Sequence, residues 1–448
     1  MKKSVLIIFT IILFSSSSFS QIGYIEQYSD INILATNNLL ETKDKGYMLL
    51  TTKNNSLYIL CVDSLAKKNW DIELKYNEKT TEGITHTKLN DSIYLGLGKS
   101  EGNIYVVKFD YKGDTIWTKL YGDSQNNTPC GLVTTSDSSI IISGYNENAY
   151  EQGFLLKLNK QGDSVYYKTN DWSTTKNRYN SIIETGDDES VIAVGQLNDD
   201  LFIAKYNNTG DTIWTKQYGG NSTDAAYSIV KSNNDFLVVG SSYIPGDLYT
   251  ESYILKINQL GDTIWTKKFG GDYYHDIAYS IDSLLNDKYI IVGEHNSVFG
   301  GDVTNGFYSI INNEGDILST QIYRPSENAI FYSATLVTDN SYQILGKQGD
   351  DLLLLRTNND GEFNTSLKQI DNFDFLVYPN PAENSITLKN LHSNFVNLEI
   401  YNINGQLVLS EKLNSSSPDI DISKLIGGIY LIKFIGSNNY ITSRFIKK

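Results

Sequence analysis

Two tyrosines, a histidine and an aspartate stand side by side at Tyr273, Tyr274, His275 and Asp276. Aromatic rings next to a carboxylate suit sugar binding, because the ring stacks on the sugar and the carboxylate accepts hydrogen bonds from hydroxyls. A solvated loop would also explain the cluster, since exposed aromatics are common in a chain with 32 tyrosines. The cluster is therefore a candidate binding site, and the solvated loop stays open as its structural alternative.

Two further aromatic residues lie in the longest insertions of the chain. Tyr249 belongs to the insertion Ser242–Glu251, and Phe299 belongs to His295–Asn305. Binding residues concentrate on variable loops that a rigid scaffold holds in place. We therefore add Tyr249 and Phe299 to the candidate binding residues.

Signals for catalysis and for metals are weak. The four histidines are not spaced as metal ligands, and neither a cysteine cluster nor a G-x-S-x-G nucleophile turn is present. Paired acids in turns, such as Asp350-Asp351, could bind Ca²⁺, but no complete EF-hand loop accompanies them. We expect no metal, no cofactor and no catalytic residue that the sequence reveals, although carboxylates from distant segments could still converge on one site.

Composition and charge exclude several partners. The net charge of −15 disfavours nucleic acid and anionic lipid, whose phosphates require clustered Lys and Arg. Lys2 and Lys3 precede the apolar run Val5–Phe14, and small residues lead to a cleavage site before Gln21, so residues 1–20 are expected to be a secretory signal peptide. The apolar run is too short to span a bilayer, and no transmembrane span is expected.

After export, the two cysteines of the chain could pair in principle. Cys61 and Cys130 both fall in apolar strand contexts, where a free cysteine behaves as a small buried hydrophobic residue. A disulfide would also require strict bridging geometry between two strands. We expect two free thiols, with the disulfide as the alternative.

The dominant pattern of the sequence is an internal repeat. GDTIWTK occurs at Gly113–Lys119, Gly210–Lys216 and Gly261–Lys267, and seven related units of about 50 residues fill residues 31–370 after a lead-in at 21–30. Each unit carries four short strand signals separated by polar turns. This is typical of a propeller blade, so the sequence predicts an all-β fold with a seven-bladed β-propeller, six or eight blades being possible.

The repeated segment itself has a structural explanation. A residue of the Asx type lies three positions before each turn glycine, as a tight hairpin with a bulge requires. An aromatic residue follows the glycine position by four in five units, where it is expected to pack between neighbouring blades: Trp70, Trp117, Tyr166, Trp214 and Trp265. If these hairpins join the third and fourth strands, the longest loops, and any binding site, lie on the opposite face of the ring.

After residues 371–374, a linker, the pattern changes. Residues 375–448 contain alternating strands with turns at Asn404-Gly405 and Gly427-Gly428, which predict a small C-terminal Ig-like β-sandwich. Several of its motifs occur in a fixed order up to the last residue of the chain: Tyr378, Pro379, Asn380, Pro381, Gly405, Gly427, Gly428, Tyr430, Lys447 and Lys448.

In these motifs the segment resembles the type A C-terminal sorting domain of the type IX (Por) secretion system of Bacteroidota. Asn402 stands where that family usually has an aspartate, a departure that a turn tolerates. The resemblance implies that the type IX secretion machinery is a partner, and that the protein passes through the periplasm and is secreted or held on the outer cell surface.

Two functions of different class follow for the propeller. The first is a binding or adhesion module for glycan or protein, favoured by enlarged loops without a catalytic constellation. The second is a carbohydrate-active enzyme, a glycoside hydrolase or lyase, on the same scaffold. A pair of central carboxylates in a pocket would favour hydrolysis, whereas an aromatic platform poor in acids would favour binding.

Overall fold

The computed structural model describes residues 24–28, 31, 39–122, 126–147, 151–169, 176–186, 188–219, 223–243, 250–270, 274–297, 303–337, 341–357, 368–369, 376–389, 395–402, 406–412, 419–436 and 439–448. Contacts between Cα atoms divide the chain into a first unit, Met1–Phe363, and a second unit, Asn364–Lys448. The elements assigned within these residues are β-strands.

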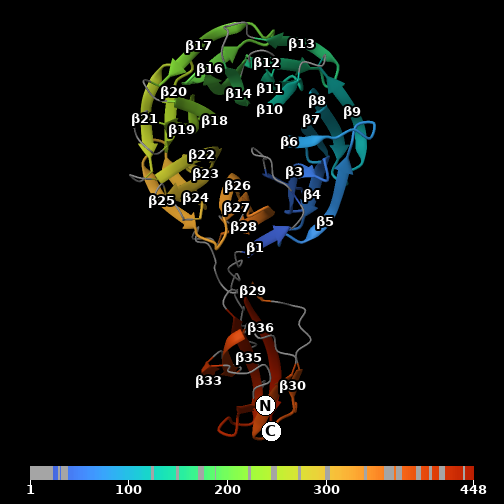
Figure 1. Ribbon diagram of the computed structural model, residues 1–448, viewed down its shortest axis with the longest axis vertical. Coiled ribbons are helices and arrows are strands. Elements are labelled where there is room, and N and C mark those ends of the chain that lie inside the picture. Colours follow the sequence, from blue (N-terminus) through green and yellow to red (C-terminus); the bar gives the residue numbers. More distant parts are fainter. Residues whose placement is uncertain are drawn as a thin grey trace, which may run out of the picture. The chain divides into compact units, whose positions relative to one another are not determined.

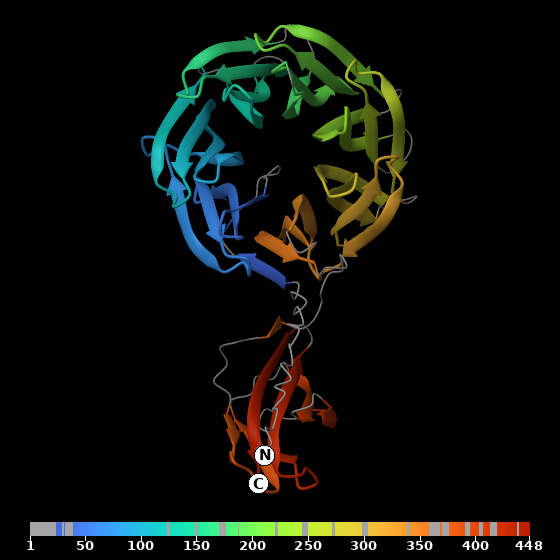
Figure 2. The same cartoon turned by 180° about the vertical axis from the view of Figure 1, so that it is seen from behind.

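Twisted antiparallel sheets stand around a common centre in the first unit (Figures 1 and 2). Along the chain, the first three sheets consist of β2 (Leu39–Glu41), β3 (Tyr47–Lys53), β4 (Ser56–Val62) and β5 (Lys68–Leu74); β6 (Glu82–Asn90), β7 (Ile93–Ser100), β8 (Asn103–Asp110) and β9 (Thr115–Tyr121); and β10 (Asn127–Thr134), β11 (Ile140–Glu147), β12 (Glu151–Leu158) and β13 (Ser164–Thr169). In each, the first strand lies innermost and the fourth lies on the rim.

The remaining sheets follow the same order. They consist of β14 (Asn177–Glu184), β15 (Val191–Leu197), β16 (Asp200–Tyr206) and β17 (Thr212–Tyr218); β18 (Thr223–Ser232), β19 (Asp235–Tyr243), β20 (Thr250–Ile257) and β21 (Thr263–Phe269); β22 (Tyr274–Ser283), β23 (Lys288–Ser297), β24 (Asn305–Asn312) and β25 (Ile317–Tyr323); and β26 (Ala329–Leu336), β27 (Tyr342–Gln348) and β28 (Asp351–Arg356), which β1 (Tyr24–Tyr28) completes. One residue pair, Thr250 with His275, joins the sheets of β18–β21 and β22–β25.

This arrangement confirms the predicted all-β propeller. The second and third strands of each sheet are nearly continuous apolar runs, as in β4, where all seven residues are buried. Neighbouring sheets cover both faces of these strands, so neither face needs the polar residues that a half-exposed strand would carry. The described residues form seven sets of four strands, which we call blades.

Strand β1 closes the ring. It pairs antiparallel with β28, from Tyr24 opposite Arg356 to Tyr28 opposite Leu352, and so occupies the rim of the seventh blade. Residues 21–30, which were expected to be a lead-in before the seven units, therefore contain a strand of the ring itself. β1 has five residues, lies far from β28 along the chain and is not part of a complete repeat unit, so the repeat pattern did not reveal it.

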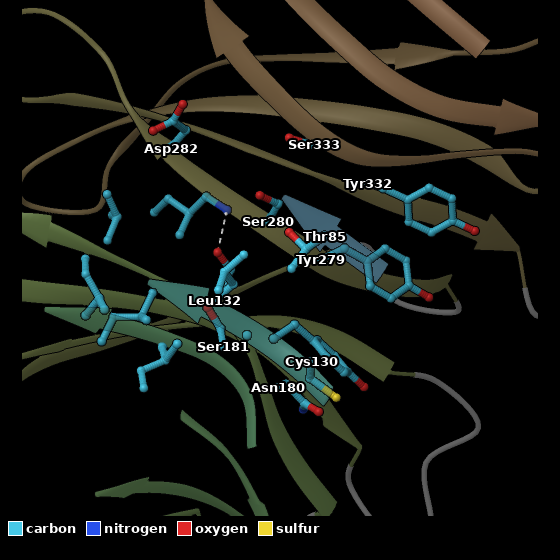
Figure 3. Close-up of a pocket in the computed structure, with 18 of the residues that line it drawn as sticks. Thr85, Cys130, Leu132, Asn180, Ser181, Tyr279, Ser280, Asp282, Tyr332 and Ser333 are labelled. Atoms are coloured by element: carbon cyan, nitrogen blue, oxygen red, sulfur yellow. Dashed lines mark hydrogen bonds between the residues drawn. The ribbon is translucent and has the colours of Figure 1, made fainter. Parts of the chain in front are cut away.

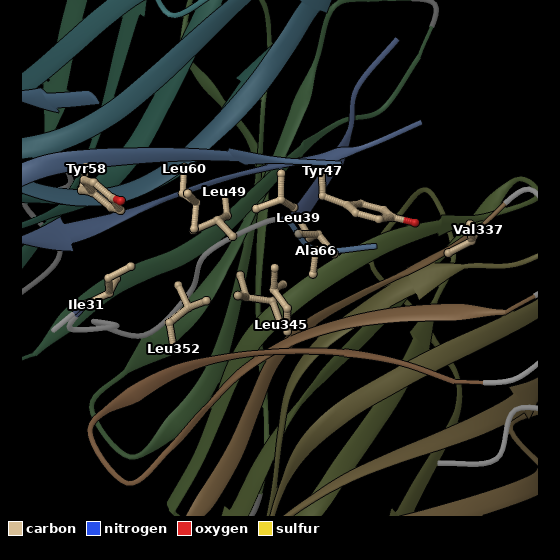
Figure 4. Close-up of a cluster of buried hydrophobic side chains, with 12 residues drawn as sticks. Ile31, Leu39, Tyr47, Leu49, Tyr58, Leu60, Ala66, Val337, Leu345 and Leu352 are labelled. Carbon is tan, nitrogen blue, oxygen red and sulfur yellow. The ribbon is translucent and has the colours of Figure 1, made fainter. Parts of the chain in front are cut away.

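A buried apolar cluster accompanies the closure (Figure 4). It joins side chains of the first blade with side chains of the seventh, and Ile31, which follows β1, also belongs to it. Fully buried leucines face each other across this junction, including Leu49 and Leu60 on one side and Leu345 and Leu352 on the other. The closing strand is thus backed by a continuous core.

The repeated GDTIWTK segment builds the contact between blades. In the hairpin before β21, Gly261 has a φ of 76°, and the Asn258 side chain accepts hydrogen bonds from the backbone N–H groups of Leu260 and Asp262 at 2.9 Å each. The ring of Trp214, from the preceding blade, lies so close that a Cβ at Gly261 would be 2.9 Å from it. Glycine is therefore required both by the backbone and by the neighbouring ring.

The same contact recurs around the ring. The aromatic residue of each rim strand packs on the turn glycine of the next blade in five pairs: Trp70 with Gly113, Trp117 with Gly162, Tyr166 with Gly210, Trp214 with Gly261 and Trp265 with Gly315. In the first blade Ala66 takes the place of the glycine and holds the same left-handed conformation, with a φ of 62°. Each of these five aromatic side chains thus lies against the turn of the next blade.

The last residue of the repeated segment adds an ion pair between blades. Each of four lysines reaches the aspartate that follows the next blade's turn glycine, at N–O distances between 2.5 and 3.2 Å: Lys119 with Asp163, Lys168 with Asp211, Lys216 with Asp262 and Lys267 with Asp316. These lysines hold the pKa of the aspartates below its ordinary value. The aspartates are exposed, so the pairs align the blades and add little stability.

The second unit contains two facing sheets. One consists of β29 (Lys368–Gln369), β36 (Asn439–Lys447), β35 (Gly428–Gly436), β32 (Phe395–Asn402) and β33 (Leu407–Lys412), and the other of β30 (Leu376–Tyr378), β31 (Ser385–Lys389) and β34 (Asp419–Asp421). Ile386 and Ile420 from the small sheet share one core with Leu398, Ile400 and Ile432 from the large one. The unit is a small β-sandwich.

Candidate functional site

The cluster at Tyr273–Asp276 is only partly within the described residues. Tyr273, Tyr249 and Phe299 lie outside them, and only the backbone of Tyr274 is described, at the start of β22. The imidazole Nδ1 of His275 lies 3.2 Å from the hydroxyl of Thr250 on β20. Asp276 is buried, with 3% of its surface exposed, and cannot offer its carboxylate to a ligand from outside.

Asp276 instead occupies a repeated structural position. Its carboxylate lies 2.5 Å from the Nδ1 atom of His295 on the neighbouring β23 and packs against Gly270 at the end of the preceding rim strand. Buried residues hold the equivalent position at the start of five other inner strands or directly before it: Thr81, Asn127, Asn177, Asp224 and Ala329. Because one position is buried in every one of these blades, Asp276 contributes to the scaffold.

A second repeated position points to the centre of the ring. The six inner strands β6, β10, β14, β18, β22 and β26 each carry a β-bulge at the same place, three residues after the buried position. A bulge leaves one residue unpaired and turns its side chain relative to the sheet. The extra residues are Ile84, Cys130, Asn180, Tyr227, Tyr279 and Tyr332.

These bulges border a cavity of about 360 Å³ inside the ring of inner strands (Figure 3). Five of the six bulged residues line it, and so do the residues that follow the bulges: Thr85, Gly131, Ser181, Ser228, Ser280 and Ser333. In Figure 3 the rings of Tyr279 and Tyr332 lie at one end of the cavity and Asp282 lies at the other, with the hydroxyl side chains between them. The cavity therefore runs from an aromatic end past hydroxyl side chains to a single carboxyl group.

Three consecutive blades supply the aromatic end. The ring centroids of Tyr227 and Tyr279 lie 5.6 Å apart and those of Tyr279 and Tyr332 lie 5.8 Å apart, with interplanar angles near 50°. Tyr227 and Tyr279 are partly exposed, whereas Tyr332 is buried, with 7% of its surface exposed. Tilted rings at this spacing form a continuous aromatic wall.

A carboxyl group fixes the middle ring of this wall. The Tyr279 hydroxyl hydrogen-bonds with Glu294 on β23. Burial raises the pKa of Glu294, an effect that this hydrogen bond and the charge of Lys347 oppose. Burial, together with the Glu294 charge, also raises the pKa of Tyr279 well above its ordinary range, so the phenol stays protonated and can donate.

Two other groups of the cavity lining can titrate. Burial raises the pKa of Asp282, although hydrogen bonds from Ser283 and Thr335 oppose the change. Burial also raises the pKa of the Cys130 thiol to about 12, which keeps it neutral and unreactive. Cys130 and Cys61 are free thiols, as expected, and the alternative of a disulfide between them is wrong.

A second, more open cavity of about 650 Å³ lies between the sixth and seventh blades. Thr304 and Asn328 border it, together with Glu327, Lys347 and Asp350. It is on the face opposite to the GDTIWTK hairpins, where loops between second and third strands emerge. Lys347 lines this cavity, and its positive charge also opposes the rise in the pKa of Glu294, next to the aromatic wall.

In the second unit, the first and last motifs of the sorting segment come together. Ala382, directly after Tyr378–Pro381, pairs with Lys447 in a parallel bridge and accepts a hydrogen bond from the Lys448 N–H at 2.8 Å. Asn380 accepts a hydrogen bond from the Ile446 N–H at 2.9 Å. Residues at opposite ends of the domain sequence thus form one corner of the sandwich.

The remaining sorting residues have separate places. The Tyr430 ring stacks on Phe445 in the core, with 5.6 Å between centroids, while Gly427 and Gly428 lead into β35. Gly405 lies outside the described residues. Asn402 accepts a hydrogen bond from the Gln406 N–H at 3.0 Å, so asparagine supports this turn as an aspartate would.

Sequence reasoning missed the central cavity. The signal was present, because the inner strands of blades four to seven each place a serine after the bulged residue, as in Tyr227-Ser228 and Tyr279-Ser280. Strict alternation of strand residues hides such a site, since a bulge shifts the side chains by one position. Only the register of the paired strands shows that these residues face the centre.

Comparison with known proteins gives one family match. Residues 376–448 match the family model of the secretion system C-terminal sorting domain. Such domains mark proteins exported by type IX secretion to the cell surface or beyond it, and they imply contact with the type IX machinery. No helix in the part of the chain that the structure describes is long and apolar enough to cross a membrane. The sorting domain and the strand topology together describe an exported all-β propeller protein.

Other similarities are remote. A regulatory protein, FlaEY, from Caulobacter vibrioides is 23% identical over 44% of this chain, and an uncharacterized WD repeat-containing protein from Acanthamoeba polyphaga mimivirus is 23% identical over 31%. The chain spans 18% and 8% of the lengths of these two relatives.

Similar solved structures share about a tenth of their residues with the chain. The extracellular domain of a hybrid two-component system from B. thetaiotaomicron has a TM-score of 0.49 at 10% identity, covering 96% of this chain and 60% of its own. Hydrazine synthase from Kuenenia stuttgartiensis has a TM-score of 0.47 at 10% identity, over 70% and 93% of the two chains. A Bacteroides caccae protein of unknown function has 0.41 at 11%, over 61% and 93%.

Proposed function

We propose that this protein is an exported carbohydrate-binding module, which the C-terminal domain directs to the cell surface or the medium and whose propeller holds glycan in the central cavity. The observation that carries this proposal is the aromatic wall of Tyr227, Tyr279 and Tyr332, which stands next to a layer of hydroxyl side chains. Aromatic faces beside a few polar groups are what sugar recognition uses.

Binding is favoured over hydrolysis by the acid content of the cavity. A glycosidase needs two carboxyl groups flanking the bond that it cleaves, about 5–10 Å apart. Among the described residues that line the cavity, Asp282 is the single carboxylate. Glu294 does not line the cavity, and its carboxyl group is engaged in a hydrogen bond with the Tyr279 side chain. The cavity has the aromatic, acid-poor character that a binding site requires.

A glycan array with the purified full chain tests the proposal. We expect binding of at least one neutral glycan and clearly weaker binding in Tyr227→Ala, because that ring is partly exposed at the wall. Tyr111→Ala is the matched control, since Tyr111 is exposed on a hairpin between third and fourth strands. Binding that survives Tyr227→Ala unchanged would contradict the proposed site.

An assay for released reducing sugar runs on the same glycans. We expect no release of reducing sugar. Release that Asp282→Asn abolishes would show that the propeller is a carbohydrate-active enzyme and would refute the proposed binding module. A protein ligand is the remaining outcome, and it would show as binding to surface proteins that free sugars do not compete away.

A further inference from the structure

We propose that the central cavity takes the end of a neutral oligosaccharide and does not hold the middle of a chain. This inference rests on the proposed function and concerns the part of the glycan that is recognised. It follows from the enclosure of the cavity, from its layers and from the charges that line it.

Enclosure decides how a ligand enters. The lining comes from the inner strands of all seven blades, from Leu39 and Leu40 in the first to Ser333 and Ala334 in the seventh. A polymer cannot lie across a cavity that strands surround on every side. It can enter only along the axis of the ring, and therefore by one of its ends.

The layers match the order of groups on a sugar chain that enters in this way. Tyr227 and Tyr279 offer faces for stacking on the first ring. Beyond them, Ser181, Ser228 and Ser280 supply hydroxyls that can both donate and accept hydrogen bonds. The Ser228 hydroxyl accepts a hydrogen bond from the Ile281 N–H at 3.4 Å and can still donate its own proton to a ligand.

Charge decides that the ligand is neutral. The described lining residues include neither lysine nor arginine, so an acidic sugar would find no partner for its carboxylate or sulfate. Their one acid, Asp282, is held toward its neutral form by burial, and the chain carries a net charge of −15. An acidic sugar would lose the hydration of its charge on entering the cavity, whereas a neutral sugar has no charge to desolvate.

Size limits how much of the chain is bound. About 360 Å³ is near the lower end of the range of small-molecule sites, roughly 300–1,000 Å³, which suits one or two sugar rings. Further sugars of the chain would remain outside the ring of strands. Affinity should therefore stop rising once the ligand is two residues long.

Titration calorimetry with the full chain tests the inference, using linear glucose, cellulose-type and xylan-type oligosaccharides of one to six residues and α-cyclodextrin, a ring of six glucoses without ends. We expect at least one linear series to bind, with affinity constant from two residues upward within about twofold. α-Cyclodextrin should not bind. Tyr227→Ala should weaken the binding by about tenfold, as the loss of one stacked aromatic ring predicts, and Tyr227→Phe should retain it.

Each other outcome refutes end recognition alone or both proposals together. Affinity that keeps rising to five or six residues, or tight binding of α-cyclodextrin, overturns end recognition, and the binding function survives if Tyr227→Ala still weakens it. Binding that Tyr227→Ala leaves unchanged overturns both proposals for the cavity. Failure of every series on the titrations and on the array likewise overturns both, provided that tryptophan fluorescence shows the ring to be folded.

Discussion

Position 261 should require glycine for two reasons, the left-handed backbone conformation and the close approach of the Trp214 ring. Gly261→Ala places a Cβ in a left-handed conformation, with a φ of 76°, which costs about 1 kcal/mol. The same Cβ lies 2.9 Å from the ring of Trp214, and the overpacking adds about 2 kcal/mol. We expect a total loss of about 3 kcal/mol in the free energy of unfolding.

Removing the ring separates the two contributions. Trp214→Ala by itself should cost about 3 kcal/mol, because roughly 100 Å² of buried apolar surface contributes ~2.5 kcal/mol. The hydrogen bond from Nε1 to the Gln259 carbonyl, at 3.2 Å, accounts for the rest. In that background, Gly261→Ala should cost only the backbone part, about 1 kcal/mol. The two substitutions should therefore couple by about 2 kcal/mol.

Denaturant unfolding followed by tryptophan fluorescence measures this cycle, because all five tryptophans precede residue 363 and report on the first unit alone. Gly186→Ala is the control. Its φ is 127°, but a Cβ there would find only the Lys231 amine, at 4.0 Å, so its cost should be the same with and without Trp214. Strictly additive costs for Trp214→Ala and Gly261→Ala would refute the proposed contact.

Four other predictions address the charges, the closure and the export of the protein. Burial raises the pKa of Asp282, so its protonated form contributes fully to stability below the ordinary value of 3.8, and this contribution is lost as the pH rises through the raised value. Asp282→Asn should therefore raise the melting temperature more at pH 7 than at pH 4, and equal shifts would contradict this. Lys216→Met should lower stability only slightly, and 1 M salt should erase the difference between it and the parent protein; a loss that salt leaves unchanged would argue against an exposed ion pair. Deletion of residues 24–28 should lower the denaturant midpoint strongly and promote aggregation through the exposed edge of β28, whereas an unchanged midpoint would show that β1 does not hold the ring. Deletion of residues 376–448 should leave the propeller in the periplasm, and its normal appearance in the medium would argue against the sorting role.

The repeat made most of the fold predictable. Exact copies of GDTIWTK fix the register of the hairpins, and from that register the contact of Trp214 with the next blade follows without any structure. Even the irregular first unit obeys it, since Ala66 adopts the conformation of the missing glycine. Local turn chemistry repeated at a constant period is a strong signal because each copy confirms the others.

The site was less predictable, for two physical reasons. Asp276 stands in an attractive sequence beside Tyr274 and His275, yet the register buries it against His295. Conversely, Tyr227 and Tyr279 resemble ordinary strand residues, and each turns toward the centre only because it is the extra residue of a bulge. A shift of one residue reverses the side of a strand on which a side chain lies, and sequence patterns resolve such shifts poorly.

Strand β28 is the last strand of the ring before the chain continues to the sorting domain, and β1 makes it an interior strand. Hydrogen-bonded ladders flank it on both sides, with β27 along one edge and β1 along the other. If a cell holds the protein by its C-terminal domain while the ring grips a fixed glycan, tension runs along β28. Pulling β28 out of the ring requires both hydrogen-bonded ladders to break at once, so its pairing with β1 also strengthens the link between the ring and the C-terminal domain against mechanical force.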